Sequence, residues 1–274
     1  MRPMPDSSIR KPWRPAPLFS ASVALHGAAI AAMAVRPHVW PWALGAIAAD
    51  HLLLSAVGLW PRSVLLGSNW TRLPEVAAKR AAIAITIDDG PHPDITPRVL
   101  ELLDEHGAKA TFFCIGEKVR RYPEIAREIL HRGHAVENHS QRHRHHFSLM
   151  GPRGLMEEIG RAQESITAVT GLVPRFFRAP AGLRNPFLDP VLARLDLQLA
   201  SWTRRGFDTV SRDPGAVLAK LTRHLRGGDI LLLHDGHPGR HPSGQALVLE
   251  VLPRLLAAVS AAGLQPITLR SALT

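Results

Sequence analysis

Two adjacent carboxylates, Asp88 and Asp89, directly follow the apolar run AIAITI at residues 82–87. Two imidazoles, His139 and His143, stand four residues apart in the later segment NHSQRH. One carboxylate and two imidazoles are a common ligand set for a divalent metal, and they leave positions open for water and substrate. The set suits zinc, and also cobalt, manganese, iron or nickel. These residues therefore predict a metal site in which the second carboxylate is free to act as a base.

Two more polar residues end apolar runs, Arg178 in FFR and His234 in DILLLH. An arginine beside the base would keep it ionised and oriented, and a histidine across the site could protonate a leaving group. A divalent metal would keep both acids ionised and lower the pKa of metal-bound water towards ~7. Taken singly, each residue could belong to a turn, a helix cap or a solvated loop. Together they indicate one hydrolytic site.

The C-terminal 190 or so residues alternate between apolar runs and helical patterns. The predicted elements must position the polar side chains named above. The helical patterns begin or end at proline and glycine, for example at Pro97 and Gly107 or at Pro214 and Gly227. This alternation predicts an α/β fold with a parallel sheet, either doubly wound or closed into a barrel, and both place chemistry at the carboxyl ends of strands. The expected strands are residues 82–87, 110–115, 134–138, 175–178, 197–202, 229–234 and 265–269.

The motifs TIDDG, HSQRH, RAPAG and LLLH resemble, in order and spacing, those of the NodB-homology polysaccharide deacetylases, carbohydrate esterase family 4. The resemblance covers roughly residues 80–270. It implies a distorted (β/α) barrel of about seven parallel strands. It also implies Asp88 as the catalytic base, Arg178 as the residue that orients it, and His234 as the catalytic acid.

The same resemblance implies Asp89, His139 and His143 as the metal ligands. The family reaction is hydrolysis of an N-acetyl group on a sugar, or sometimes of an O-acetyl or N-formyl group. We therefore expect a metal-dependent hydrolase that acts on N-acyl groups, chiefly N-acetyl, of a cell-envelope polysaccharide or a lipid-linked glycan.

One segment departs from the family pattern. Many members carry Asp-x-x-Asp-Trp after the fifth strand, and its first Asp supports the catalytic histidine. In the corresponding WTRRGFDT, Arg205 replaces the first Asp, Thr209 replaces the Trp, and Asp208 matches the second Asp. Either Asp208, Asp235 or another acid orients the histidine, or the pKa of the histidine is lower than usual.

The departure also leaves two interpretations of the arginine open. Arg205 either binds an anionic group of the substrate or is an ordinary surface residue. We expect substrate contacts at Pro180, Trp202, Arg205 and Asp208. The competing hypothesis is a catalytically silent, membrane-bound sugar-binding or scaffold protein that keeps the fold.

The positive charge is concentrated at the N-terminus. The chain carries a net +10, and residues 1–80 hold nine Lys or Arg against three Asp or Glu, or 9 − 3 = +6. A nucleic-acid-binding protein would instead spread a basic face over its folded domain. The single cysteine, Cys114, is expected as a buried apolar residue. Neither observation points to a nucleic-acid partner or a disulfide.

The N-terminal segment predicts a membrane anchor. We expect a basic, proline-rich tail at 1–17, two apolar helices at 18–60, a linker at 61–81 and the deacetylase domain at 82–274. Asp50 interrupts the second apolar segment, and His26 lies at a similar depth in a hairpin. A cleaved signal peptide or a pair of helices lying in the membrane interface are the alternatives.

The distribution of basic residues predicts the orientation. Four basic residues precede the first apolar segment, Arg36 alone separates the two, and four more follow by residue 80. The positive-inside rule then places both ends, and the catalytic domain, on the cytoplasmic side of a bacterial-type inner membrane. The periplasm is the alternative, which a single span would give.

Overall fold

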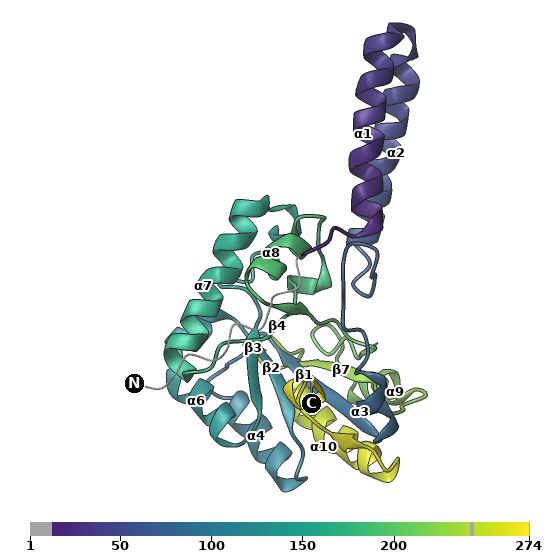
Figure 1. Cartoon of the computed structure of the whole chain (residues 1–274). Coiled ribbons are helices and arrows are strands. Elements are labelled where there is room, and N and C mark those ends of the chain that lie inside the picture. Colours follow the sequence, from purple (N-terminus) through teal and green to yellow (C-terminus); the bar gives the residue numbers. More distant parts are fainter. Residues whose placement is uncertain (1–12, 242–243, 274) are drawn as a thin grey trace.

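The computed structural model describes residues 13–241 and 244–273. Most of the expected basic tail at 1–17 therefore lies outside the described residues. The described chain forms an α/β domain with a helical hairpin that projects from it (Figure 1).

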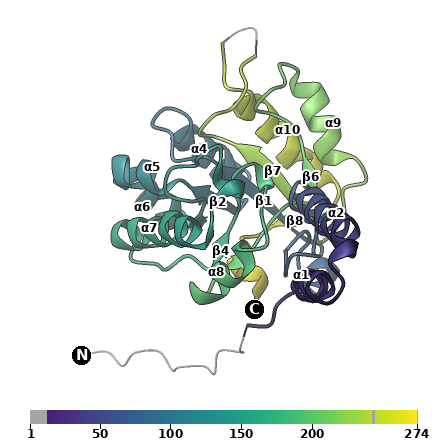
Figure 2. The ribbon, with the colours of Figure 1, turned by 90° about the horizontal axis from the view of Figure 1, so that it is seen from above.

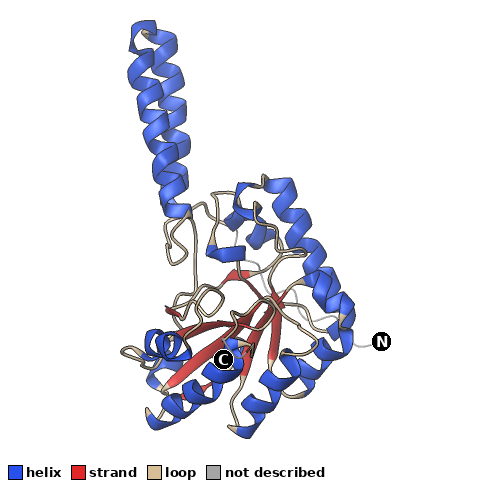
Figure 3. Ribbon diagram, turned by 180° about the vertical axis from the view of Figure 1, so that it is seen from behind, coloured by secondary structure: helices blue, strands red, loops and turns tan. Residues whose placement is uncertain are grey.

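A parallel sheet forms the centre of the domain, as the alternating pattern predicts (Figure 3). Its strand order is β5-β4-β3-β2-β1-β7-β6, and β8 pairs with the start of β1. Each of the seven expected strands is present, although several are shorter than expected, and the two-residue strand β6 was not expected. The strands are β1 (Ala82–Asp88), β2 (Ala110–Cys114), β3 (Ala135–Asn138), β4 (Phe176–Phe177), β5 (Gln198–Leu199), β6 (Arg204–Arg205), β7 (Ile230–His234) and β8 (Gln265–Pro266).

Helices surround the sheet, and the view from above shows them around its outer side (Figure 2). The longer ones agree with the sequence pattern, whereas α3, α5 and α8 are too short to give a helical period and were not expected. The helices of the domain are α3 (Glu75–Lys79), α4 (Thr96–Glu105), α5 (Gly116–Arg121), α6 (Pro123–His131), α7 (Pro152–Thr170), α8 (Leu188–Arg194), α9 (Pro214–Thr222) and α10 (Leu247–Ala261). Short 3-10 turns lie at Pro37–Val39, Phe147–Leu149, Pro180–Gly182 and Arg270–Leu273.

Strand β1 is the centre of the core, because all seven of its residues are buried. Ile83, Ile85 and Ile87 are fully buried among side chains of α4 and α10. Each fully buried isoleucine contributes roughly 1.5–3 kcal/mol relative to an exposed one. The strand is therefore a rigid support for the two carboxylates at its end. Cys114 is also fully buried, as expected.

Part of the segment expected as a linker belongs to the domain. Leu73 and Ala77 are buried in a cluster with Ala84 and Phe176. Trp70 pairs in parallel with the chain just after β5, where its N–H donates to the Leu199 carbonyl at 2.8 Å. This pairing covers an edge of the sheet that would otherwise be exposed.

Helices α1 (Pro17–Val35) and α2 (Trp40–Gly58) form the projecting hairpin (Figure 1). Both are long and apolar enough to cross a membrane, by length and composition. Asp50 is only 8% exposed and accepts a 2.6 Å hydrogen bond from the Ser22 hydroxyl. The expected proximity of His26 is confirmed, since its Nδ1 lies 3.9 Å from the Asp50 carboxylate. The Ser22 contact was not expected.

Candidate active site

The carboxyl ends of β1 and β7 and the loops after β3 and β4 bring the predicted residues together. Asp88 and His234 are directly paired across β1 and β7. A cavity of about 170 Å³ opens above them. Its lining consists of Asp88, Asp89, His139, His143, Ala181, Gly182, Trp202, Arg205, Thr209, Leu232, His234 and His237. Two strand ends and the loops beside them therefore enclose one space.

Asp89, His139 and His143 have the geometry of a metal site. The Nε2 atoms of both histidines lie 3.3 Å from Asp89 Oδ1. Bonds of about 2.0–2.2 Å around a tetrahedral zinc ion separate neighbouring ligand atoms by about 3.3–3.6 Å. Asp89 Oδ1 is buried and has no hydrogen-bond partner, which suits a metal ligand better than a structural carboxylate. The three residues therefore fit a divalent ion.

The surroundings prepare these side chains for metal binding. His139 Nδ1 donates a 2.9 Å hydrogen bond to the Arg178 carbonyl, which leaves its Nε2 lone pair free. Burial, followed by the charge of His139, lowers the pKa of His143 to about 4, so its ring is neutral at pH 7. Burial alone would raise the pKa of Asp89, but the neighbouring His139, followed by His234 and His143, lowers it overall. The Asp89 carboxylate and the His143 ring are thus in their metal-binding protonation states.

A lysine from another element, which the sequence did not reveal, supports the loop around Asp89. Asp89 has a left-handed backbone with φ of 72°, which costs energy for a residue other than glycine. Lys118, from α5, donates to the Asp89 carbonyl at 2.8 Å and to the Gly236 carbonyl at 3.2 Å. A Cβ atom at Gly236 would lie 1.8 Å from the Asp89 carbonyl oxygen. The short helix and the glycine thus hold Asp89 in place.

Asp88 is positioned by Arg178, as the resemblance implies. The fully buried guanidinium donates from Nη1 to Asp88 Oδ1 at 2.7 Å and from the same nitrogen to the Thr86 hydroxyl at 2.7 Å. Its other nitrogens donate to backbone carbonyls, and the ring of Phe113 lies 4.1 Å away. Because the arginine is fixed on every side, it holds the carboxylate of Asp88 rigidly at the edge of the cavity.

His234 has an acid behind it despite the departure in WTRRGFDT. Asp208 is fully buried and lies 2.9 Å from His234 Nδ1 through Oδ1, while its Oδ2 accepts from the His234 N–H at 2.8 Å. Burial opposes protonation of His234, but the hydrogen bond and charge of Asp208 outweigh it and raise the pKa. Asp235 instead accepts from the Thr96 hydroxyl. Of the acids considered from the sequence, the structure thus places Asp208 beside the histidine.

The expected substrate residues divide into two groups. Trp202 and Arg205 line the cavity, whereas Pro180 and Asp208 are buried and are not among its lining residues. His237 also lines the cavity and was missed. Its only signal in the sequence is its place three residues after His234.

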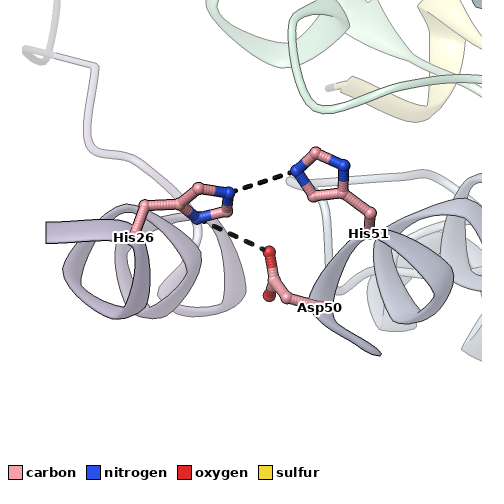
Figure 4. Close-up of side chains that lie close together, drawn as sticks. All are labelled: His26, Asp50 and His51. Atoms are coloured by element: carbon pink, nitrogen blue, oxygen red, sulfur yellow. Dashed lines mark hydrogen bonds and ion pairs between the residues drawn. The ribbon is translucent and has the colours of Figure 1, made fainter. Parts of the chain in front are cut away.

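A second group of potential metal ligands lies in the hairpin, formed by His26, Asp50 and His51 (Figure 4). His26 Nε2 lies 3.1 Å from His51 Nε2, and His26 Nδ1 lies 2.8 Å from the Ser22 carbonyl. Here the Asp50 carboxylate already accepts a hydrogen bond from Ser22. Ser22 and the contact between the two histidines thus supply hydrogen-bond partners in this group, whereas Asp89 Oδ1 has none.

The base of the hairpin contacts a wall of the cavity. The Arg184 N–H donates to the Gly58 carbonyl at the end of α2, at 3.1 Å. Gly182, which lines the cavity, has φ of 74°, and a Cβ atom there would lie 2.6 Å from Trp202 and 2.7 Å from Pro61. The cavity therefore lies at the end of the domain from which the hairpin projects.

Comparison with known proteins gives a consistent result. Residues 75–200 match the family model described as polysaccharide deacetylase. The chain is 34% identical over 201 residues to a chitooligosaccharide deacetylase of Azorhizobium caulinodans, covering 70% of this chain and 95% of that protein. It is 33% identical over 183 residues to a peptidoglycan-N-acetylglucosamine deacetylase of Bacillus cereus, covering 66% and 84%. A family 4 carbohydrate esterase from Streptomyces lividans, solved with acetate, superimposes with a TM-score of 0.61 at 29% identity, covering 68% of this chain and 91% of that one.

Proposed function

Because the chain belongs to the polysaccharide deacetylase family, carbohydrate esterase family 4 with NodB homology, we propose that it is a metal-dependent deacetylase of a membrane-proximal glycan. The relatives named above act on chitooligosaccharide and on peptidoglycan N-acetylglucosamine. The observation that carries the proposal is the convergence of a metal-type triad, a fixed carboxylate and an acid-supported histidine on one cavity.

The reaction divides between two sides of this cavity. A divalent ion held by Asp89, His139 and His143, most simply zinc, would polarise the acyl carbonyl and activate water. Asp88, held by Arg178, takes a proton from the water that attacks the carbonyl carbon.

On the opposite side, His234 donates its Nε2 proton to the nitrogen of the sugar as the carbon–nitrogen bond breaks. Asp208 stabilises the protonated ring through its contact with Nδ1. The products are acetate and an amino sugar, with one water consumed. The position of Asp208 argues against a catalytically silent protein, because that alternative would gain support if no acid lay within hydrogen-bond reach of His234.

The hairpin anchors the enzyme in the membrane, with the catalytic domain on the cytoplasmic side. Support comes from the apolar length of α1 and α2 and from the basic residues that flank them. Gly182, which lines the cavity, lies against Pro61, three residues after the end of α2 at Gly58. A lipid-linked amino sugar, held at the bilayer surface, would suit this arrangement.

The activity is tested with the full chain in detergent micelles containing zinc. Acetate release is followed from N-acetylglucosamine oligomers and from a lipid-linked N-acetylglucosamine. Asp88→Asn removes the base and is expected to lower the rate at least 100-fold, by the usual scale of general-base catalysis (about 10²–10⁴). Asp94→Asn, at an exposed position of the same loop, is the matched control. Equal rates for the wild type and Asp88→Asn would refute the proposed function.

The orientation is tested separately. A C-terminal fusion to a reporter that is active only in the periplasm should be silent in cells, while a cytoplasmic reporter should be active. Periplasmic activity would rule out the two-span arrangement and leave the catalytic proposal untouched.

A further inference from the structure

The two arginines of β6 point in opposite directions, as neighbouring residues of a strand do. Arg204 donates to Asp229 at 2.9 Å and to the His224 carbonyl at 2.6 Å. Arg205 instead lines the catalytic cavity. The pairing of β6 with β7 fixes this difference, since Arg205 is opposite Leu232, which also lines the cavity.

Arg205 has no anionic partner among the residues that the structure describes. Its Nε atom is buried and has no hydrogen-bond partner. The other arginine at the site, Arg178, is neutralised by Asp88 at 2.7 Å. A partly buried guanidinium without a counter-ion loses hydration, and a ligand that supplies a negative charge would offset this loss.

Two aromatic rings hold the guanidinium of Arg205 at the cavity. Its central carbon lies 5.5 Å from the centre of the Trp202 ring and 4.9 Å from that of Phe207. Such contacts position a cation and leave its N–H edge free for bidentate hydrogen bonds to a phosphate or carboxylate. Phe207 has φ of 61°, an uncommon conformation for an aromatic residue, and this places it in a tight turn beside the arginine.

From these observations we propose that Arg205 is the anion-binding residue of the active site. The substrate would then be an N-acetylated amino sugar that carries a phosphate or carboxylate near the acyl group. This inference rests on the proposed deacetylase function and specifies its substrate class. Asp88 is already paired with Arg178, so Arg205 is the arginine of the cavity that is left to meet the charge of a substrate.

The test compares substrates of different charge with one set of variants. Wild type, Arg205→Gln and Arg205→Lys are assayed on N-acetylglucosamine 1-phosphate, on its prenyl-linked diphosphate, on a carboxylate-bearing N-acetylmuramic acid oligosaccharide and on a neutral N-acetylglucosamine oligomer. Arg212→Gln removes the same charge at an exposed position outside the cavity and is the control.

For Arg205→Gln we expect kcat/KM to fall about 10–100-fold on an anionic substrate, mainly through KM, because one charged hydrogen-bonded contact is lost. The fall on the neutral oligomer should be under threefold, and Arg205→Lys should recover part of the loss. Comparison of the rates on the sugar 1-phosphate, the prenyl-linked diphosphate and the carboxylate-bearing oligosaccharide identifies which anionic group Arg205 binds. An equal loss on all four substrates, or no loss on any, would overturn the proposal.

A binding measurement separates this inference from the proposed function. Calorimetry of N-acetylglucosamine 1-phosphate with the zinc-loaded full chain needs no turnover. If the wild type binds at least tenfold more tightly than Arg205→Gln but releases no acetate, the anion site stands and the deacetylase function fails. If both bind equally while acetate is released, the function stands and the anion site fails.

Discussion

The Asp208→Asn variant tests how the site sets the protonation of its acid. Asp208 Oδ1 lies 2.9 Å from His234 Nδ1, and the two side chains are 0% and 8% exposed. At an effective dielectric constant of about 20, a charge pair at this distance interacts by about 6 kcal/mol. Burial of the histidine opposes this interaction without cancelling it, so we expect the variant to lower the pKa of His234.

The sign of the effect follows from the role of His234 as a proton donor. The histidine must be protonated to act, so a lower pKa moves the alkaline limb of the kcat/KM profile to lower pH by the same amount. At pH values above the alkaline limb, acetate release should fall at least tenfold relative to the wild type, since general acid catalysis contributes about 10²–10⁴-fold, and the deficit should shrink as the pH is lowered.

The assay is acetate release between pH 5 and pH 9, with circular dichroism to check folding. Asp213→Asn makes the same change at the exposed N-cap of α9, where asparagine also caps well, and should leave the profile unchanged. An alkaline limb that stays in place in Asp208→Asn would refute the assignment of Asp208 as the support of His234.

Three further predictions concern the metal site and stability. His143→Ala should reduce bound zinc from one ion per chain to well below it, whereas His146→Ala, at an exposed neighbouring position, should not; metal analysis after gel filtration decides. Gly236→Ala should lower the free energy of unfolding by about 1–3 kcal/mol and weaken zinc binding, because its Cβ would displace the Asp89 backbone; an unchanged melting temperature would contradict this. Burial lowers the pKa of His134 from 6.5 to about 4, so the unfolded chain binds a proton first as the pH falls. The free energy of unfolding should therefore drop by about 2 kcal/mol more between pH 7 and pH 5 in the wild type than in His134→Gln, as measured by urea titration at each pH.

The sequence predicts the catalytic core of the site because that core depends on a regular feature of the fold. Parallel strands align their carboxyl ends, so polar residues placed after β1, β3, β4 and β7 must converge. Asp88 and His234 are paired directly across two neighbouring strands. The contact of Arg178 with Asp88 follows from the same geometry.

What the sequence does not predict depends on short or irregular segments. Strand β6 has two residues, too few for any periodicity, so the opposite orientations of Arg204 and Arg205 could not be read from the pattern. Lys118 donates to backbone carbonyls of loops that are distant in the sequence, and no spacing rule relates the lysine to those loops. Asp208 and Asp235 were both candidates to support His234, and only the packing of the loop after β6 distinguishes them.

The junction between hairpin and domain was also beyond prediction. The N–H of Arg184 reaches Gly58 across more than a hundred residues of chain. Such a contact depends on the path of the chain through the whole sheet, whose order is β5-β4-β3-β2-β1-β7-β6, and no local signal marks either residue. The hairpin itself was predictable, because apolar length is a property of composition.

The most direct test of the central claim is a metal titration of the stripped enzyme. The full chain is treated with a chelator, and acetate release is measured as zinc is added back. We expect activity to fall to background, to return in proportion to zinc and to saturate at one ion per chain, and we expect that zinc cannot restore His139→Ala. Full activity of the metal-free chain, or full restoration of His139→Ala, would contradict it.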